Sequence, residues 1–270
     1  MTMDKSKTDL INFLKEHCSE YFNNNAFPLF RADYDIEREW RMFNTDKTRK
    51  PLNTSKLIHN ITNEYFHQKF GKALRTETIF AGDMQAIADK YVDYRSEVGA
   101  TTLVYWLIPF NSYELYYSMQ TDDYYNWVDH STSIAMVFSA HNETDWLIDL
   151  FKKNEHFLMS IMLSSLAKEN LKDLFESPSR HSGTVLLGRV LSLIMAESHG
   201  DLDGKCASIL TRPILFKMLE LLEYKKSKTS AHNGLEVMVD CDSYVLINPK
   251  IFNDDFAKLD ELVSNKGTSK

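Results

Sequence analysis

Apolar residues recur at helical spacing early in the chain and again over a long stretch beyond its middle. Residues 6–23 and 54–70 each carry an apolar stripe of this kind, and Gly71 marks the end of the second. From 144 to 226, leucine, isoleucine, phenylalanine and methionine keep that spacing almost throughout. The pattern predicts two early helices and a helical insertion of roughly 80 residues.

Stretches rich in β-branched and aromatic residues predict strands on both sides of the insertion. The strongest, 101–110, is almost continuously apolar. Shorter strands are expected at 26–31, 76–81, 112–118, 131–138, 234–241 and 244–247. Two strand-rich blocks interrupted by helices predict an α+β fold. We expect a single domain, residues 1–270, with the helical insertion at about 144–226.

Residues 79–91 join the end of an apolar strand to a short helix. The carboxylate of Asp83, in the turn, is expected to cap the first turn of that helix. Tyr91 follows eight residues later on one helix face. The polar stretch 32–49 predicts a loop or short helix, and 264–270 is expected to be disordered.

Charge and composition narrow the classes of function. A net charge of −7 over 270 residues disfavours nucleic-acid binding across the whole surface. A local basic strip remains, formed by Lys47, Arg49, Lys50 and Lys56. The three widely spaced cysteines suit reduced thiols, and the histidines show no metal-ligand spacing. Without a long apolar run or an N-terminal signal core, we expect a cytoplasmic protein with no metal and no membrane contact.

Three short segments carry the candidate chemistry. Phe30-Arg31-Ala32 ends the first expected strand, and Phe80 precedes the turn that leads to Tyr91. Glu236 begins a late strand, with apolar residues on either side of it. In their types and order, these segments resemble the ADP-ribosyltransferase superfamily of the diphtheria-toxin and poly(ADP-ribose)-polymerase type, especially its phage- and toxin-encoded members. Ala32 stands where that family usually has glycine.

The resemblance implies a split antiparallel β-sheet core with a helical insertion. It implies that Arg31 anchors NAD, that Phe80 and Tyr91 hold the nicotinamide ring, and that Glu236 is the catalytic carboxylate. Breaking the bond between nicotinamide and ribose develops positive charge on the ribose, and a carboxylate beside it stabilises that charge. NAD would be the substrate, and no metal is required.

The implied activity is mono-ADP-ribosyl transfer by a toxin-like or defence enzyme. The acceptor would be an RNA or DNA base or a protein side chain, and an antitoxin or inhibitor protein is a further expected partner. The basic strip keeps RNA or DNA open as the acceptor, whereas the acidic total favours protein.

Each candidate residue also has a simpler interpretation. Arg31 alternatively pairs with Asp33 or another acidic residue that follows it, and Tyr91 packs as an ordinary helix aromatic. Glu236 is alternatively a solvent-facing strand residue, and Arg75 either lines the cleft or pairs locally. The whole chain is then a catalytically inactive relic of the fold that acts as an interaction protein.

Overall fold

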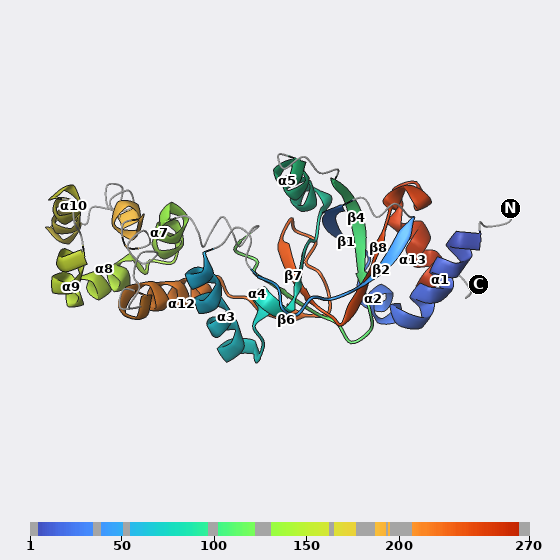
Figure 1. Ribbon diagram of the computed structural model, residues 1–270, viewed down its shortest axis with the longest axis horizontal. Coiled ribbons are helices and arrows are strands. Elements are labelled where there is room, and N and C mark those ends of the chain that lie inside the picture. The colour runs from blue at the N-terminus through green and yellow to red at the C-terminus, as the bar shows by residue number, and fades with distance from the viewer. Residues whose placement is uncertain are drawn as a thin grey trace. The chain divides into compact units, whose positions relative to one another are not determined.

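The computed structural model describes residues 5–34, 39–50, 55–96, 102–121, 131–161, 165–176, 187–192, 194 and 207–264. The chain divides into two compact units. One comprises Met1–Arg49, Leu74–Asp122 and Tyr224–Lys270, and the other comprises Lys50–Ala73 and Asp123–Glu223. The first unit holds the described strands, and the second is helical (Figure 1).

The strands of the first unit form one antiparallel sheet of eight strands, in the order β2-β8-β4-β1-β3-β7-β5-β6. The strands are β1 (Leu29–Tyr34), β2 (Trp40–Asn44), β3 (Ile79–Gly82), β4 (Thr102–Pro109), β5 (Glu114–Tyr117), β6 (Lys225–Ser227), β7 (Glu236–Asp240) and β8 (Ser243–Ile247). An open antiparallel sheet with helices confirms the expected α+β class.

The ladder between β1 and β3 is much shorter than its neighbours. On one side β1 pairs with β4 from Leu29↔Leu107 to Tyr34↔Thr102. On the other side its register with β3 is the single pair Phe30↔Gly82. The two halves of the sheet are therefore joined by backbone pairing at only one position of this ladder.

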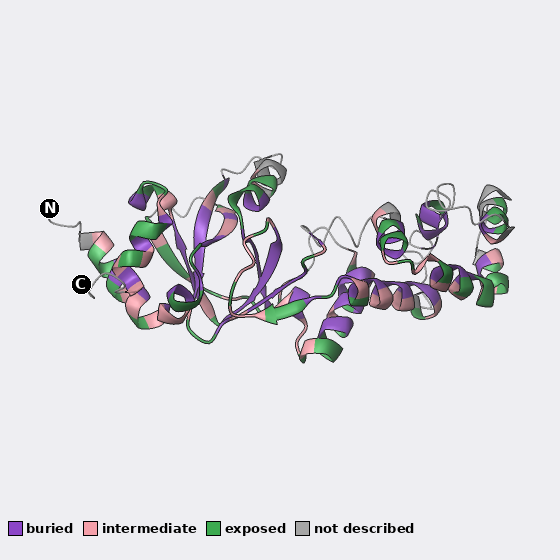
Figure 2. Ribbon diagram, turned by 180° about the vertical axis from the view of Figure 1, so that it is seen from behind, coloured by how far each residue is buried: buried purple, intermediate pink, exposed green. Residues whose placement is uncertain are grey.

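Helices cover the strands on different sides. Helices α1 (Lys5–His17), α2 (Ser19–Asn24) and α13 (Phe256–Ser264) share the main core with the sheet. Helix α5 (Gln85–Ser96) contacts β1, β3 and β4 on another side, and the short α4 (Leu74–Glu77) contacts β7 (Figure 1). The central strands are buried between these layers (Figure 2).

Gly82 allows α5 to approach β3 closely. A Cβ at this position would lie 2.6 Å from Cβ of Ile87 and 2.9 Å from the carbonyl oxygen of Met84. Real Cβ atoms do not come so close to other atoms, so a larger residue would displace the start of α5. Glycine here sets the spacing between the helix and the sheet.

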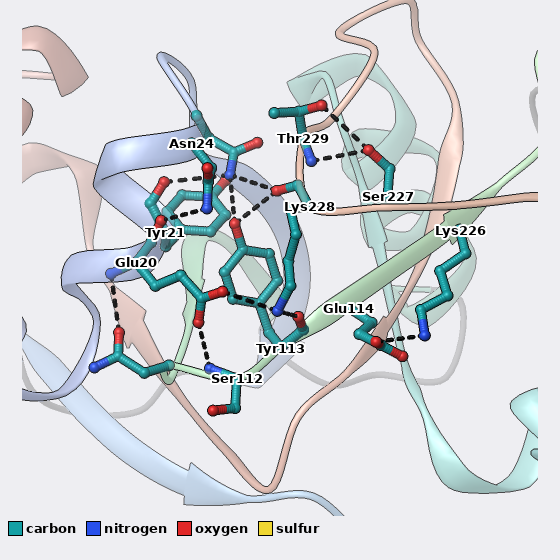
Figure 3. Close-up of polar contacts among 12 residues, drawn as sticks. Glu20, Tyr21, Asn24, Ser112, Tyr113, Glu114, Lys226, Ser227, Lys228 and Thr229 are labelled. Carbon is teal, nitrogen blue, oxygen red and sulfur yellow. Dashed lines mark hydrogen bonds and ion pairs between the residues drawn. The ribbon is translucent and has the colours of Figure 1, made fainter.

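A polar network ties α2 to β5 and to the segment after β6 (Figure 3). The side-chain amide of Asn25 donates to the Tyr113 hydroxyl at 2.9 Å and to the Lys228 carbonyl at 3.0 Å. The Lys228 ammonium lies 2.9 Å from Oε1 of Glu20, and the amide of Ser112 donates to Oε2. The hydrogen bond from Lys228 lowers the pKa of Glu20, and burial raises the pKa of Tyr113 to about 12.

The second unit is built around α12 (Arg212–Leu221). It packs against α3 (Lys56–Phe70) and α7 (Ser131–Ala140). The unit also contains α8 (Thr144–Lys153), α9 (Glu155–Ile161), α10 (Ser165–Glu176) and the short η1 (Ala207–Thr211). The guanidinium of Arg212 holds Glu64 of α3 through two hydrogen bonds, from Nε at 3.0 Å and from Nη2 at 2.5 Å.

The boundaries of α3 follow the expected signals. The Ser55 side chain accepts a hydrogen bond from the amide of Ile58, and Gly71 ends the helix in the left-handed conformation with φ of 76°. The expected early helix is two helices, α1 and α2. Disorder was expected at 264–270, but Ser264 is the last residue of α13, and 265–270 lie outside the described residues.

Three expectations about secondary structure were wrong. Residues 131–138 form helix α7, because Ile134 and Phe138 are buried on one face whereas Met136 is 52% exposed, which is a helical and not an alternating pattern. The polar stretch before residue 49 contains strand β2, an edge strand that pairs only with β8 among the described strands. The helical insertion was expected to continue to about residue 226, but residues 225–227 form strand β6.

Among the described residues, the structure contains no helix that is both long and apolar enough to cross a membrane.

Candidate functional site

Phe80 lies on the side of the sheet that faces away from the main core. Its neighbours Ile79 and Ala81 belong to that core, so Phe80 projects to the other face of β3. Phe80 is opposite Met238 of β7, and two residues further Gly82 is opposite Glu236. Residues opposite each other in an antiparallel pair share a face, so Phe80 and Glu236 project from the same face of the sheet.

Glu236 begins β7 and is almost fully buried. Leu235, Val237 and Val239 belong to the main core, whereas Glu236 does not, as the alternation in the sequence indicates. Its side chain is not solvent-facing, since the residue is only 8% exposed. Oε1 lies 3.9 Å from Nη1 of Arg75, which is supplied by α4 and is also buried. A charge at this depth needs such a partner.

Two guanidinium groups contact the ring of Phe80. The Cζ atom of Arg49 lies 4.3 Å from the ring centroid, and that of Arg75 lies 4.5 Å from it. Both distances are in the range of cation–π attraction. Arg75 therefore connects the aromatic ring to the carboxylate of Glu236, and Arg49 adds a second positive charge at the same ring.

Arg31 reaches Phe80 from the neighbouring strand. Its Nη1 donates to the carbonyl oxygen of Phe80 at 2.9 Å, and its Nε donates to Oδ2 of Asp33 at 3.0 Å. Pairing between β1 and β3 stops at Phe30↔Gly82, and the guanidinium of Arg31 satisfies a carbonyl just beyond that point. The structure thus contains both the ion pair with Asp33 and a link to the candidate site.

A small pocket lies where β1 and β3 separate. Its volume is about 70 Å³. It is lined by Phe30, Arg31, Ala32, Arg49, Phe80, Ala81, Gly82 and Ala88. Two guanidinium groups and no carboxylate are among these lining residues, so the pocket presents positive charge on largely apolar walls.

Tyr91 lies on α5, the helix that contacts β1, β3 and β4. Its neighbour Ala88, one turn earlier, lines the pocket. The side chain of Tyr91 lies outside the described part of the structure. Its proposed contact with nicotinamide stays a prediction.

Asp83 has a different part from the expected helix cap. Its carboxylate accepts hydrogen bonds from the backbone amides of Asn233, at 2.9 Å, and Leu235, at 2.6 Å. Its carbonyl oxygen lies 2.8 Å from Nδ1 of His232. Asp83 is completely buried. The residue that sequence analysis assigned to α5 therefore organises the segment that leads into Glu236.

Thiol and metal chemistry have little support in the described residues. Cys18 and Cys241 are buried free thiols, and burial raises the pKa of each to about 12, so neither is a thiolate near neutral pH. Within the same part of the chain, no three His, Cys, Asp or Glu side chains are grouped so that they could hold a metal ion.

The sequence did not single out the two arginines that complete the site. In the sequence, Arg49 is one cation of a basic strip, and Arg75 either lines a cleft or pairs locally. The partner of Arg75 is Glu236, which is distant in sequence. Arg75 lies on α4, which contacts β7, and no local pattern encodes that contact.

Comparison with models of known protein families, with curated proteins and with solved structures finds no match for this chain.

Proposed function

We propose that the protein is an NAD-dependent mono-ADP-ribosyltransferase. One observation carries the proposal: Arg31 contacts the backbone of Phe80, and Glu236, distant in sequence, projects from the same face of the sheet as the Phe80 ring. Arg31 holds the carbonyl of Phe80, and Arg75 contacts both the ring of Phe80 and the carboxylate of Glu236. The short ladder between β1 and β3 supports a sheet that is split at this point.

In this proposal each residue has a defined part in the reaction. Arg31 anchors the dinucleotide, Phe80 and Tyr91 hold nicotinamide, and Glu236 lies beside the ribose. The bond between nicotinamide and ribose C1′ breaks, and its electron pair leaves with nicotinamide. The carboxylate of Glu236 stabilises the positive charge that develops on the ribose. The acceptor nucleophile then bonds to C1′ and releases its proton to Glu236 or to water.

The acceptor is a macromolecule, and the charges of the strand unit favour a protein. Lys47 of the basic strip forms an ion pair with Asp242, with Nζ 2.6 Å from Oδ1, and Arg49 contacts Phe80. Both cations therefore already have protein partners, and the net charge of the whole chain is −7. RNA or DNA bases are the other acceptor class, which a salt titration of binding would reveal through a steep loss of affinity.

A cytoplasmic enzyme of this kind, acting as a toxin or in defence, would need a restraining partner. An antitoxin or inhibitor protein that covers the candidate site is the expected form of that restraint.

Two observations favour a second function. The pocket beside Phe80 is about 70 Å³, whereas sites for small molecules usually measure about 300–1,000 Å³. Guanidinium groups also occupy positions over the ring that nicotinamide would need. Both features suit a catalytically inactive relic of the fold that acts as an interaction protein.

Labelled NAD distinguishes the two functions. The purified chain is incubated with NAD labelled in the adenylate part and with a cell lysate, and labelled macromolecules are separated and counted. We expect labelled product from the wild-type chain, and none from Glu236→Gln, which keeps the shape of the side chain but loses its charge. NAD should raise the melting temperature of both proteins.

Asp240→Asn is the matched control. Asp240 lies on the same strand and the same face as Glu236 and is also buried, but it is at the far end of β7. This variant should keep transferring ADP-ribose. Normal transfer by Glu236→Gln would exclude Glu236 as the catalytic residue. A wild-type chain that makes no product and shows no NAD-dependent shift in melting temperature would be the inactive relic.

A further inference from the structure

The pocket between β1 and β3 has the chemistry of an anion site. Arg31 and Arg49 are its charged lining residues, and the remaining walls are alanine, glycine and phenylalanine. Guanidinium groups bind phosphate oxygens through paired hydrogen bonds, and low-polarity walls strengthen such contacts. A cationic ring, such as the nicotinamide of NAD, would be repelled by the same two groups.

The size of the pocket fits a single phosphate group. A volume of about 70 Å³ has room for roughly five water molecules, and a phosphate group has a similar number of non-hydrogen atoms. The pocket also lies at the end of a strand ladder, where β1 and β3 separate. A phosphate could therefore enter between the strands without breaking an existing ladder.

We propose that this pocket binds a phosphate of the NAD diphosphate, and that Arg49 is the residue that grips it and thereby uncovers Phe80. Arg49 is only partly buried, so its side chain has room to turn. A guanidinium gains more from a charge-assisted contact with phosphate than from an aromatic ring. When Arg49 turns to the phosphate, its place over the ring becomes free for nicotinamide.

This coupling accounts for the small size of the pocket while Arg49 lies over Phe80. Arg75 stays with Glu236, so one guanidinium keeps the ring in place while the other moves. The assignment of the bound phosphate to NAD rests on the proposed function, whereas the binding of a phosphate group by the pocket does not.

Inorganic pyrophosphate and ADP-ribose are the probes, and their binding to the full chain is measured by calorimetry at two salt concentrations. We expect both to bind the wild-type protein, and more weakly at high salt. Arg49→Gln should weaken both by about tenfold or more, which corresponds to about 1.4 kcal/mol. Arg49→Lys should retain part of the affinity, because it keeps the charge but loses the paired geometry.

Lys47→Gln is the control. It removes one positive charge, as Arg49→Gln does, but Lys47 lies two residues from Arg49 and does not line the pocket. It should leave both affinities within about twofold, well under the 1.4 kcal/mol of a tenfold change. The proposal is overturned if the wild-type chain binds no pyrophosphate, or if Arg49→Gln and Lys47→Gln behave alike.

The same experiment separates this inference from the proposed function. If pyrophosphate binding depends on Arg49 but the chain has no transferase activity, the anion site is supported and the proposed enzymatic function is contradicted. If Arg49→Gln changes neither transferase activity nor ADP-ribose affinity, the enzymatic function is supported and the proposed role of Arg49 is contradicted.

Discussion

Asp83 holds Leu235, the residue immediately before Glu236, by two hydrogen bonds. The amide of Leu235 donates to Oδ1 of Asp83 at 2.6 Å, and the amide of Asp83 donates to the carbonyl of Leu235 at 3.0 Å. The first residue of β7 is thus fixed by a buried carboxylate at the end of β3. The position of the candidate catalytic group therefore depends on the side chain of Asp83, which holds the residue before it.

Replacing Asp83 with asparagine should loosen this connection. Asparagine presents an NH₂ group where one of the two backbone amides now finds an acceptor, so a buried donor loses its partner. We expect a loss of about 1–3 kcal/mol in the free energy of unfolding. In the transferase assay, kcat should fall more than KM for NAD rises, because Glu236 is displaced while the dinucleotide anchor is intact.

Asp89→Asn is the control for that variant, since Asp89 is an exposed residue of α5. Urea unfolding and steady-state kinetics of both variants make the comparison. Equal stability and equal kcat for Asp83→Asn and Asp89→Asn would show that the buried carboxylate does not position Glu236.

Arg75 and Glu236 should be strongly coupled in stability. Arg75→Gln leaves a buried carboxylate without its guanidinium, which we expect to cost about 3 kcal/mol of the free energy of unfolding. The double variant Arg75→Gln/Glu236→Gln should lose less than the sum of the two single losses. Urea unfolding of the four proteins measures the coupling.

The exposed pair Lys47–Asp242 provides the reference, because surface ion pairs contribute about 0–1 kcal/mol. Its double-mutant cycle should show little coupling. If the losses at Arg75 and Glu236 simply add, then the two side chains do not stabilise each other.

Gly82→Ala should both destabilise the strand unit and disturb the pocket. The added Cβ would lie 2.6 Å from Cβ of Ile87, so α5 must shift, at a cost of about 1–3 kcal/mol. Ala88, one residue further along α5, lines the pocket, so pyrophosphate and ADP-ribose affinity should also fall. Thermal unfolding and calorimetry measure the two effects.

Gly71→Ala is the control for Gly82→Ala, because it tests the cost of backbone conformation without a steric clash. Gly71 has φ of 76° with nothing within 4 Å of an added Cβ, so alanine there costs about 1 kcal/mol through backbone conformation. Ligand affinity should be unchanged in that variant. Undiminished affinity in Gly82→Ala would mean that α5 does not shape the pocket.

Acid should remove the contribution of Glu20 to stability. The hydrogen bond from Lys228 holds the pKa of Glu20 below its ordinary value of 4.5 in the folded chain. Its stabilising contribution is therefore fully present above pH 4.5 and is lost as the pH falls through the lowered folded value. Wild type should be more stable than Glu20→Gln at pH 7, and the difference should shrink below pH 4.5.

Thermal unfolding of both proteins from pH 7 to pH 3 tests this sign. Glu261→Gln, on α13, serves as the control because Glu261 is an exposed carboxylate outside the network of Figure 3. A stability difference between wild type and Glu20→Gln that grows on acidification would contradict the ion pair as the cause.

Local patterns predicted the elements that depend on local physics. The apolar stripe of α3, its cap at Ser55 and its end at Gly71 all follow from helix geometry. The long apolar run of β4 is likewise a local signal of a buried strand. The prediction failed at α7, where β-branched residues favour a strand but packing against α12 selects a helix.

The candidate site divides in the same way between sequence and structure. Arg31, Phe80 and Glu236 could be proposed from residue type and order, and the alternation of β7 already turned Glu236 away from the core. The contact of Arg49 with Phe80 and the pairing of Arg75 with Glu236 could not, because these partners are distant in the chain. The role of Asp83 was hidden for the same reason, since its acceptor oxygens serve amides about 150 residues later.

By itself, the sequence determined an acidic α+β chain with two strand-rich blocks and a helical stretch between them, since hydrophobic period and charge are properties of neighbouring residues. The tertiary structure alone decided that β1 and β3 part after one register pair, and that Arg31, Arg49 and Arg75 gather around Phe80. The reason is that pairing between distant strands depends on the packing of the whole sheet, which no local window contains.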